Sequence, residues 1–551
     1  MFSPSFVAFV LLFLVALAWA INFFLVRPYF DPLRQLPGPE GSLFTSDLSR
    51  FIDPQNSATS HGACREKYGK TFSFNGFGLS DIRMMSFDVR AISYILNSPV
   101  YEKPKVSRGL LGTVLGRGIF TMEGQEHTFL RKLISPAFAT QSIKALMPIF
   151  FHEAQALKDK WDELVTPSKE VSEAPAATVL DVSLWTARST FDCFGLACLD
   201  YNFRALQGET EELYVAFRTV FDLVADKSVS RILFPILDKI WVGGTSTFMQ
   251  FISAAYRLLQ PDQIALGIKK HLAIIHRTGQ EIATRKKEEI RDEKDSSKDF
   301  LSLLLKSNLS SDPSKRLSDA DLLDQITAFL FAGSDSTALS ISWCLLYLAE
   351  HPDVQSRLRD EIATATTEYK ISEGEYPPID SYPFLNAVVR ETLRLYPSVH
   401  ATIRVATKDD VIPVSDTVVM RDGTVIPAGG GIRIRKGSYI HIPIEGLNYS
   451  KDTWGPDALE FRPERWLPEP PAFPGPSNVM SFSLGGHSCP GWRFSLAEMK
   501  AFLIVILPHF RFLPVENQVI RKYNGILTRP YVKGRMKEGF QLPLKVERLE
   551  S

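Results

Sequence analysis

A single cysteine in a glycine-rich loop constrains this chain more than any other feature. Residues 482–491 read Phe-Ser-Leu-Gly-Gly-His-Ser-Cys-Pro-Gly and deliver Cys489 to the start of a helical pattern. The backbone N–H groups of such a loop, and of the helix start that follows, direct positive partial charge toward the sulfur. That environment lowers a thiol pKa and favours the thiolate. Because no other cysteine lies nearby to complete a disulfide or a zinc site, the loop predicts a solitary thiolate.

Such a thiolate, shielded by Phe482 seven positions upstream, suits an axial ligand of haem iron. The stretch resembles the haem-binding loop of the cytochrome P450 family, Phe-x-x-Gly-x-x-x-Cys-x-Gly. By this resemblance Cys489 binds the iron of haem b, and Phe482, Gly485, His487 and Gly491 contact the cofactor. The family commonly carries Arg two residues before the cysteine. His487 stands there instead, and it lacks the permanent charge and the fork of an arginine.

His127 and Arg131 form a second motif, four residues apart, so on a helix they share one face and can bind one anion. Family members carry Trp or His and then Arg at this spacing, which implies binding of a haem propionate. Arg404 stands where the family places another propionate-binding arginine. With His487 in the loop, haem retention is expected to depend more on these three residues. The alternative is an ordinary amphipathic helix with an exposed His and Arg.

A long helix is predicted from Ser318 to about Glu350, with Ser318 and Asp321 as a capping box and Pro352 beyond its end. Its roughly 30 residues make a rod of about 45 Å, long enough to cross a domain. Its middle, residues 332–337, reads Ala-Gly-Ser-Asp-Ser-Thr.

In that stretch Gly333 lets a flat ligand approach the backbone, and Asp335 followed by hydroxyls offers a proton relay. The stretch resembles the oxygen-activation motif of the family, Ala-Gly-x-Asp/Glu-Thr-Thr/Ser. Ser336 replaces the usual Thr, so either Ser336 or Thr337 serves the relay.

Two further elements resemble the Glu-x-x-Arg and Pro-Glu-Arg motifs of the family. Glu391 and Arg394 lie three apart on a helix predicted over 382–396, where they face the same way and pair. Arg465 belongs to Phe-Arg-Pro-Glu-Arg-Trp at 461–466. The resemblance implies a buried ionic triad of Glu391, Arg394 and Arg465 whose role is structural.

Residues 6–26 form an apolar run of roughly 20 residues, long enough to cross a bilayer as a helix. A cleaved signal peptide is the competing interpretation, but the run is too long and no basic region precedes it. Arg27 and Arg34 follow the run, so the positive-inside rule places the body in the cytoplasm and the N-terminus in the lumen. A proline-rich hinge after an uncleaved anchor resembles single-pass members of the endoplasmic reticulum membrane. The predicted parts are an anchor (1–26), a hinge (27–40) and a haem-thiolate monooxygenase domain (41–551).

The 551 residues, 45% of them hydrophobic, can bury a large core, and the net charge of +0 argues against nucleic acid as a partner. The resemblance covers about residues 36–545. It implies a mainly α fold, a triangular helical prism with a small β-rich lobe, plus the N-terminal transmembrane helix. Short hairpins are predicted over 417–442. The stretch 243–260 has no match in the family pattern and is either an extra membrane-dipping loop or a gene-model error.

The implied activity is a monooxygenase that activates O2 with electrons from NADPH through cytochrome P450 reductase, with cytochrome b5 as a further candidate partner. A haem-thiolate isomerase or dehydratase, and a non-enzymatic membrane haem-binding protein, are alternatives. The acid–hydroxyl pair favours the monooxygenase. The segments that the resemblance assigns to the pocket are mostly apolar, which predicts a lipophilic substrate. The sequence is similar to fungal members of the family, which favours a terpenoid. Fatty acids and xenobiotics stay open. The pocket segments are 110–120, 217–224, 329–332, 399–402 and 526–528.

Overall fold

The computed structural model divides into two units, which we name the sheet unit and the helical unit. The sheet unit comprises Met1–Ser107, Lys227–Pro261 and Ala401–Leu447, and the helical unit comprises Arg108–Asp226, Asp262–His400 and Asn448–Ser551. The structure describes the whole chain except residues 1–3, 23–25, 27–28, 41–45, 77–80, 167–176, 226–262, 293–298, 309–315, 367–368, 370–373, 468, 470–471 and 550–551. The unmatched stretch 243–260 therefore lies outside the described residues, and both interpretations of it stay open.

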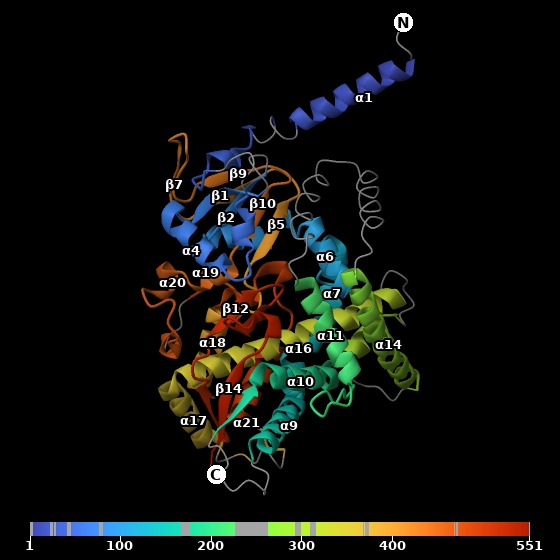
Figure 1. The fold of residues 1–551 in the computed structure, drawn as a ribbon, viewed down its shortest axis with the longest axis vertical. Helices are drawn as coiled ribbons and strands as arrows, with labels where there is room; N and C mark the ends of the chain where they lie inside the picture. Colours follow the sequence, from blue (N-terminus) through green and yellow to red (C-terminus); the bar gives the residue numbers. More distant parts are fainter. Residues whose placement is uncertain are drawn as a thin grey trace. The chain divides into compact units, whose positions relative to one another are not determined.

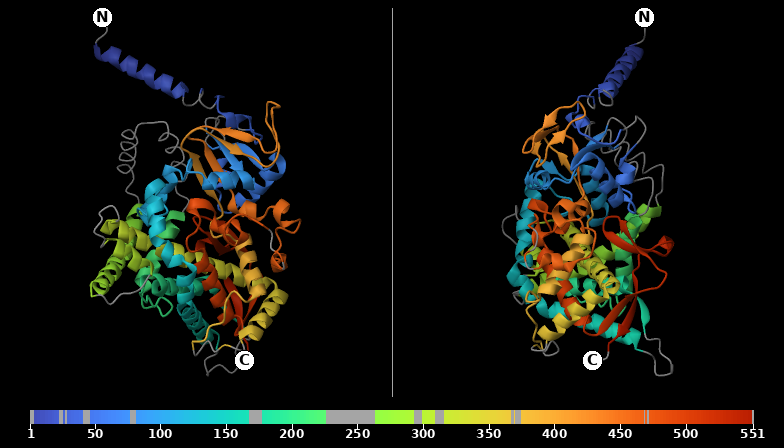
Figure 2. Two further views of the ribbon diagram at one scale, coloured as in Figure 1. Left: turned by 180° about the vertical axis from the view of Figure 1, so that it is seen from behind. Right: turned by 90° about the vertical axis from the view of Figure 1, so that its left-hand side faces the viewer.

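Five strands in the order β1-β2-β10-β5-β3 form the main sheet of the sheet unit. β2 and β10 pair in parallel, and the other neighbours are antiparallel. All four residues of β10 are buried, as expected for a strand covered on both faces. Figure 2 shows the blue N-terminal strands and the orange strands of the 401–447 segment in this one sheet. The strands are β1 (Thr71–Asn75), β2 (Ile82–Ser86), β3 (Tyr101–Glu102), β5 (Thr402–Ala406) and β10 (Tyr439–Ile442).

Of two small antiparallel pairs, only β7 with β8 is a short hairpin inside the predicted range 417–442, since β6 precedes that range. β6 (Asp410–Pro413) pairs with β9 (Gly431–Ile434), and β7 (Val418–Val419) pairs with β8 (Val425–Ile426). In the sequence, the strands of this unit alternate with the short helices α3 (Leu48–Phe51), α4 (Ser57–Tyr68), α5 (Val89–Asn97) and α19 (Ile444–Asn448). Helix α6 (Lys105–Leu115) begins in the sheet unit and continues in the helical unit.

The proline-rich segment expected to act as a hinge is packed onto the sheet unit. Pro32–Gln35 form one turn of 3₁₀ helix, and the Leu33 and Leu36 side chains are fully buried. The Arg421 guanidinium donates to the Leu36 and Gly38 carbonyls at 2.9 and 2.8 Å. These contacts offset the ordering of the segment, so residues 32–38 belong to the sheet unit rather than to a free linker.

Helices dominate the second unit. Before the long helix they are α7 (Gly124–Ile134), α8 (Thr140–Ala145), α9 (Met147–Val165), α10 (Val182–Phe194), α11 (Glu211–Ala225), α14 (Gln263–Arg291) and α15 (Phe300–Asn308). The later ones are α16 (Asp319–Glu350), α17 (Pro352–Thr366), α18 (Pro383–Leu395), α20 (Lys451–Trp454) and α21 (Trp492–Ile506). Two small sheets complete the unit: β11 (Phe510–Pro514), β14 (Pro543–Arg548) and β4 (Thr178–Asp181), and the hairpin β12 (Ile520–Asn524) with β13 (Thr528–Val532). The fold is thus mostly helical with small sheets, as predicted.

The long central helix has the predicted ends. Ser318 caps α16 by accepting a hydrogen bond from the Asp321 N–H at 3.0 Å, and the helix stops at Glu350, two residues before Pro352. Figure 1 shows α16 crossing the helical unit with α10 and α18 beside it. A buried hydroxyl pair, Thr186 Oγ1 and Ser342 Oγ at 2.8 Å, joins α10 to α16. α16 therefore forms the core on which the other helices are placed.

Among the described residues, α16 passes a test of length and apolarity for a membrane span, but 78% of its most apolar window is buried, which identifies it as a core helix. The run predicted as the anchor is helical in the structure, as α1 (Pro4–Ile21). Large apolar side chains of α1 are exposed: Leu11, Phe13, Leu14, Val15, Leu17 and Trp19. Insertion of α1 into a membrane stays a prediction.

Candidate functional site

The cysteine loop is closed on itself by the backbone. The Cys489 N–H donates to the Phe482 carbonyl at 2.9 Å, and Phe482 itself is buried. Ser483 (φ 56°) and Gly485 (φ 73°) adopt left-handed conformations, which let the chain reverse within a few residues. α21 begins at Trp492, with Gly491 as its N-cap residue. The loop therefore holds the thiol just ahead of the helix, as the sequence predicted.

Burial opposes the loop dipoles that are expected to favour a thiolate at Cys489. Cys489 keeps intermediate exposure while the other four cysteines are buried. Desolvation by the atoms packed around it nevertheless raises the pKa of Cys489 to about 11, although the Gly491 N–H and the Arg131 charge act in the opposite direction. Burial thus outweighs the loop dipoles. A metal ion bound to the sulfur would favour the thiolate, because cysteine ligates metals in its deprotonated form.

Residues from α7 and the loop meet beside the cysteine. Arg131 donates through Nη1 to the Ser488 carbonyl and through Nη2 to Ser488 Oγ at 3.3 Å. The rings of His127 and His487 lie with centroids 4.0 Å apart. The structure therefore brings together three side chains that the sequence assigned to cofactor binding, from two motifs about 360 residues apart.

These residues fit an anionic group. In the described chain the Arg131 guanidinium donates only to the carbonyl and hydroxyl of Ser488, and burial lowers its pKa. His487 Nδ1 is buried and has no hydrogen-bond partner in the described chain. The solitary thiol and this anion-binding cluster match the iron and the propionates of haem. Cys489 would hold the iron, and Arg131, His127 and His487 would hold a propionate.

Arg404 belongs to the sheet unit. It lies on β5 opposite Ile440 of β10, is buried, and donates from Nη1 to Thr402 Oγ1 at 2.8 Å and to the Ile403 carbonyl at 2.9 Å. Its predicted contact with a propionate is not tested by these bonds and stays a prediction.

The motif of α16 is arranged around an ion pair. Asp335 Oδ2 lies 2.6 Å from Arg529 Nη2 of β13, and both side chains are nearly buried. Ser336 Oγ donates to the Ala332 carbonyl at 2.6 Å within the helix. Thr337 is buried, and its hydroxyl shares a hydrogen bond of 3.0 Å with Ser495 of α21. The two candidate hydroxyls thus have different surroundings.

Gly333 lies against an aromatic ring of a neighbouring helix. A Cβ atom at this position would lie 2.0 Å from the ring of Phe194 on α10. The missing side chain therefore admits the Phe194 ring, which in turn packs against Phe494 with centroids 5.9 Å apart. Gly333 therefore allows close packing of α10 on α16, and its predicted contact with the cofactor stays a prediction.

Two small cavities lie in the helical unit, each with room for about one water molecule. Three of the five predicted pocket segments contribute to their walls, through Phe217, Phe331, Ile526 and Leu527. The segments 110–120 and 399–402 contribute none of the wall residues.

The ionic triad forms with full burial. Glu391 accepts from Arg394 Nε at 2.8 Å and Nη2 at 2.9 Å, and from Arg465 Nε at 2.8 Å. Trp466 Nε1 and the Arg462 N–H also donate to it, at 3.0 and 2.9 Å. Other N–H groups of the two guanidiniums donate hydrogen bonds to the backbone carbonyls of Asn448, Trp454, Asp457, Ala458 and Glu460. The triad therefore ties α18 to the irregular chain that leads toward the cysteine loop.

Three site residues were not found from the sequence. Glu123 Oε2 lies 2.9 Å from His487 Nε2, and its position four residues before His127 could have indicated it. Glu498 lies fully buried on α21, where burial raises its pKa to about 8. A lone acid in the apolar helix after the cysteine was the available signal. Arg529 is 194 residues from Asp335, and no sequence pattern connects them.

Comparison with known proteins agrees with this site. The family model described as Cytochrome P450 matches residues 37–535. The chain is 37% identical to Cytochrome P450 monooxygenase 205 of Postia placenta, over 97% of this chain and 96% of the relative. It is 35% identical to monooxygenase 128 of the same fungus, over 96% of both proteins. It is 29% identical to Cytochrome P450 monooxygenase claP of Ampulloclitocybe clavipes, over 98% of this chain and 97% of the relative. The chain therefore belongs to the cytochrome P450 family of haem-thiolate monooxygenases.

Proposed function

We propose that this monooxygenase oxidises a neutral lipophilic small molecule, a terpenoid in the first instance, with electrons from NADPH delivered by cytochrome P450 reductase. Haem bound through a cysteine thiolate supplies the cleavage of the O–O bond. The substrate class is supported by the aromatic and aliphatic side chains on the wall of one cavity, Phe331, Ile526, Leu527 and Phe540. The fungal source of the relatives supports a secondary metabolite.

The observation that carries the reductive reaction is the acid and hydroxyl pair of α16. Asp335 lines a cavity with room for about one water molecule, so its carboxylate can take a proton from water and return it. Ser336 is the better candidate for the hydroxyl, because Thr337 is buried and bonded to Ser495 of another helix. We propose that protons pass from water through Asp335 and a bridging water to Ser336 Oγ. An isomerase or dehydratase has no need of such a relay.

Product analysis with isotopic oxygen tests this function. Microsomes containing the full chain and a matching reductase would receive a terpene panel, a fatty-acid panel and a xenobiotic panel under ¹⁸O₂. We expect one ¹⁸O atom in a terpenoid product, only with NADPH present. Labelled product from another panel alone would replace the substrate class. Product without NADPH and without label would indicate the isomerase or dehydratase. Absence of any product from haem-loaded protein would indicate a haem-binding protein.

We also propose that α1 anchors the enzyme in the endoplasmic reticulum membrane, with its N-terminus in the lumen. Its 18 residues span about 27 Å at ~1.5 Å per residue, near the ~30 Å thickness of the hydrocarbon layer. Its exposed Phe, Leu and Trp side chains would be buried there by lipid.

Deleting residues 1–26 should therefore move the protein from the carbonate-washed membrane pellet to the supernatant. The expected change is from nearly all bound to mostly released, since the apolar helix supplies the main hydrophobic contact with lipid. The reduced-CO spectrum serves as the control that the body still folds. A truncated protein that stays in the washed pellet would show that another segment holds the membrane.

A further inference from the structure

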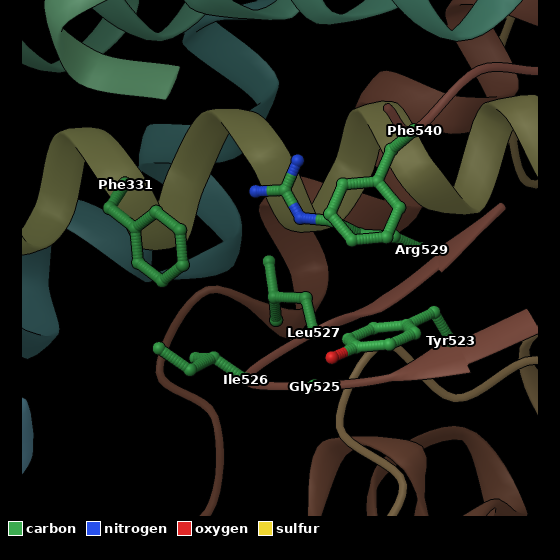
Figure 3. Close-up of a pocket in the computed structure, with 7 residues that line it drawn as sticks. All are labelled: Phe331, Tyr523, Gly525, Ile526, Leu527, Arg529 and Phe540. Carbon is green, nitrogen blue, oxygen red and sulfur yellow. The ribbon is translucent and has the colours of Figure 1, made fainter. Parts of the chain in front are cut away.

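Arg529 stands between the two small cavities of the helical unit. One cavity is lined by Phe331, Ile526, Leu527 and Phe540 together with Arg529, and the other by Arg529, Asp335 and residues of α10 and α11. Figure 3 shows the guanidinium beside the Phe540 ring, above Leu527 and Ile526. Its central carbon lies 5.5 Å from the centroid of Phe540, within the range of a cation–π contact. The long Arg529 side chain is thus held in place on the cavity wall.

The ion pair between Arg529 and Asp335 is short and largely shielded from solvent. Arg529 Nη2 and Asp335 Oδ2 are 2.6 Å apart, and the side chains are 9% and 13% exposed. Within the described chain Asp335 forms no other side-chain hydrogen bond. One carboxylate oxygen is therefore fixed by the guanidinium, while Oδ1 is left for water in the cavity that Asp335 lines.

Few other charged or titratable groups face Asp335. From α11 these are Tyr214 and Arg218, whose Oη and Nη1 lie 3.5 Å apart. α10 contributes Ala187 and Phe191 to the same cavity, both without charge. The Ser334 hydroxyl on α16 donates a hydrogen bond to the Leu330 carbonyl at 2.6 Å. Among the wall residues, Arg529 alone forms an ion pair with the carboxylate.

We propose that Arg529 is a positioning residue for proton delivery: it fixes Asp335 Oδ2 and so presents Oδ1 to the water of the adjoining cavity. This inference rests on the proposed relay through Asp335. In each cycle a water molecule gives a proton to Oδ1, and Asp335 passes a proton on through water to Ser336 Oγ. The hydroxyl releases its own proton toward the reacting oxygen, and the carboxylate returns to its ionised form. The guanidinium keeps its charge throughout.

Substitution of Arg529 tests the proposal in the full-length haem enzyme with its reductase. Arg529→Met keeps the length of the side chain and removes the charge. We expect kcat to fall by about ten- to 10²-fold, because a misplaced catalytic group loses this much, with little change in KM. NADPH consumption should become poorly coupled to product. The solvent deuterium isotope effect on kcat should rise as proton delivery becomes rate-limiting. Arg529→Lys, which keeps the charge, should recover part of the loss.

Two further variants separate a positioning role from a structural one. Arg83→Met breaks a comparable buried pair in the sheet unit, where Arg83 Nη2 lies 2.9 Å from Asp81, and it lines neither cavity. It should lower the Tm without changing coupling or the isotope effect. Asp335→Asn should uncouple by itself, and the double variant with Arg529→Met should fall no further than Asp335→Asn.

The outcomes distinguish this inference from the proposed function. If Asp335→Asn uncouples but Arg529→Met keeps the parent coupling and isotope effect, the positioning role is overturned and the relay stands. If Arg529→Met lowers the Tm as Arg83→Met does and leaves coupling and the isotope effect unchanged, the role of Arg529 is structural. The inference is then also overturned. If Asp335→Asn keeps the parent coupling, the relay itself is overturned, and the role of Arg529 with it.

Discussion

Replacing Cys489 with alanine is expected to remove all measurable turnover and the thiolate-type reduced-CO spectrum. Cys489 is of intermediate exposure while the other four cysteines are buried, and it lies at the end of a loop whose backbone bond to Phe482 holds it ahead of α21. The cluster of Arg131, His127 and His487 beside it can hold an anionic group but offers no second thiol. Loss of the sulfur therefore removes the iron ligand while leaving the partners of the propionate in place.

The matched control is Cys344→Ala. Cys344 is fully buried on α16, where desolvation raises its pKa to about 12, so it behaves as a small apolar side chain. That variant should keep both spectrum and turnover, with at most a modest loss of Tm. Reduced-CO spectra and haem content of the two purified variants test whether Cys489 is the ligand of the iron. A thiolate-type spectrum in Cys489→Ala would refute the assignment of the ligand.

Local patterns predicted the parts of this molecule that depend on neighbours in sequence. The ends of α16 follow from Ser318 and Pro352, because a cap and a helix terminator act over three or four residues. The pairing of Glu391 with Arg394 could be predicted because the two residues are three apart on one helix. The likeness to a known family then supplied Arg465, which no local rule connects to them.

Features that depend on packing were beyond such patterns. The loop around Cys489 carries the dipoles that favour a thiolate, yet burial of the sulfur in the folded chain raises its pKa. The close contact of Gly333 with Phe194 of another helix could not be read from the sequence around the glycine. The Arg529–Asp335 pair joins a strand to a helix across 194 residues, and charge composition alone cannot select one arginine among many.

The largest effect on stability is expected from Glu391→Gln. The substitution keeps the shape of the side chain but leaves two buried guanidinium groups, Arg394 and Arg465, without their carboxylate. Breaking a buried ion pair by removing one partner costs about 3–5 kcal/mol. Part of the polar network survives, since both arginines also donate to backbone carbonyls. The free energy of unfolding should fall within this range, and haem should be lost more readily, because the triad supports the chain that leads toward the cysteine loop.

Glu464→Gln provides the matched control for this prediction. Glu464 neighbours Arg465 in sequence but pairs with Arg357 on the surface, at 2.7 Å with both side chains about half exposed. Surface pairs contribute about 0–1 kcal/mol, because water already solvates both charges and screens their attraction. Haem-loaded variants would be compared in one buffer by thermal and urea unfolding and by the rate of haem transfer to an acceptor protein. A Tm of Glu391→Gln no lower than that of Glu464→Gln would mean that packing and backbone hydrogen bonds, rather than the buried charge pairs, hold this part of the enzyme together.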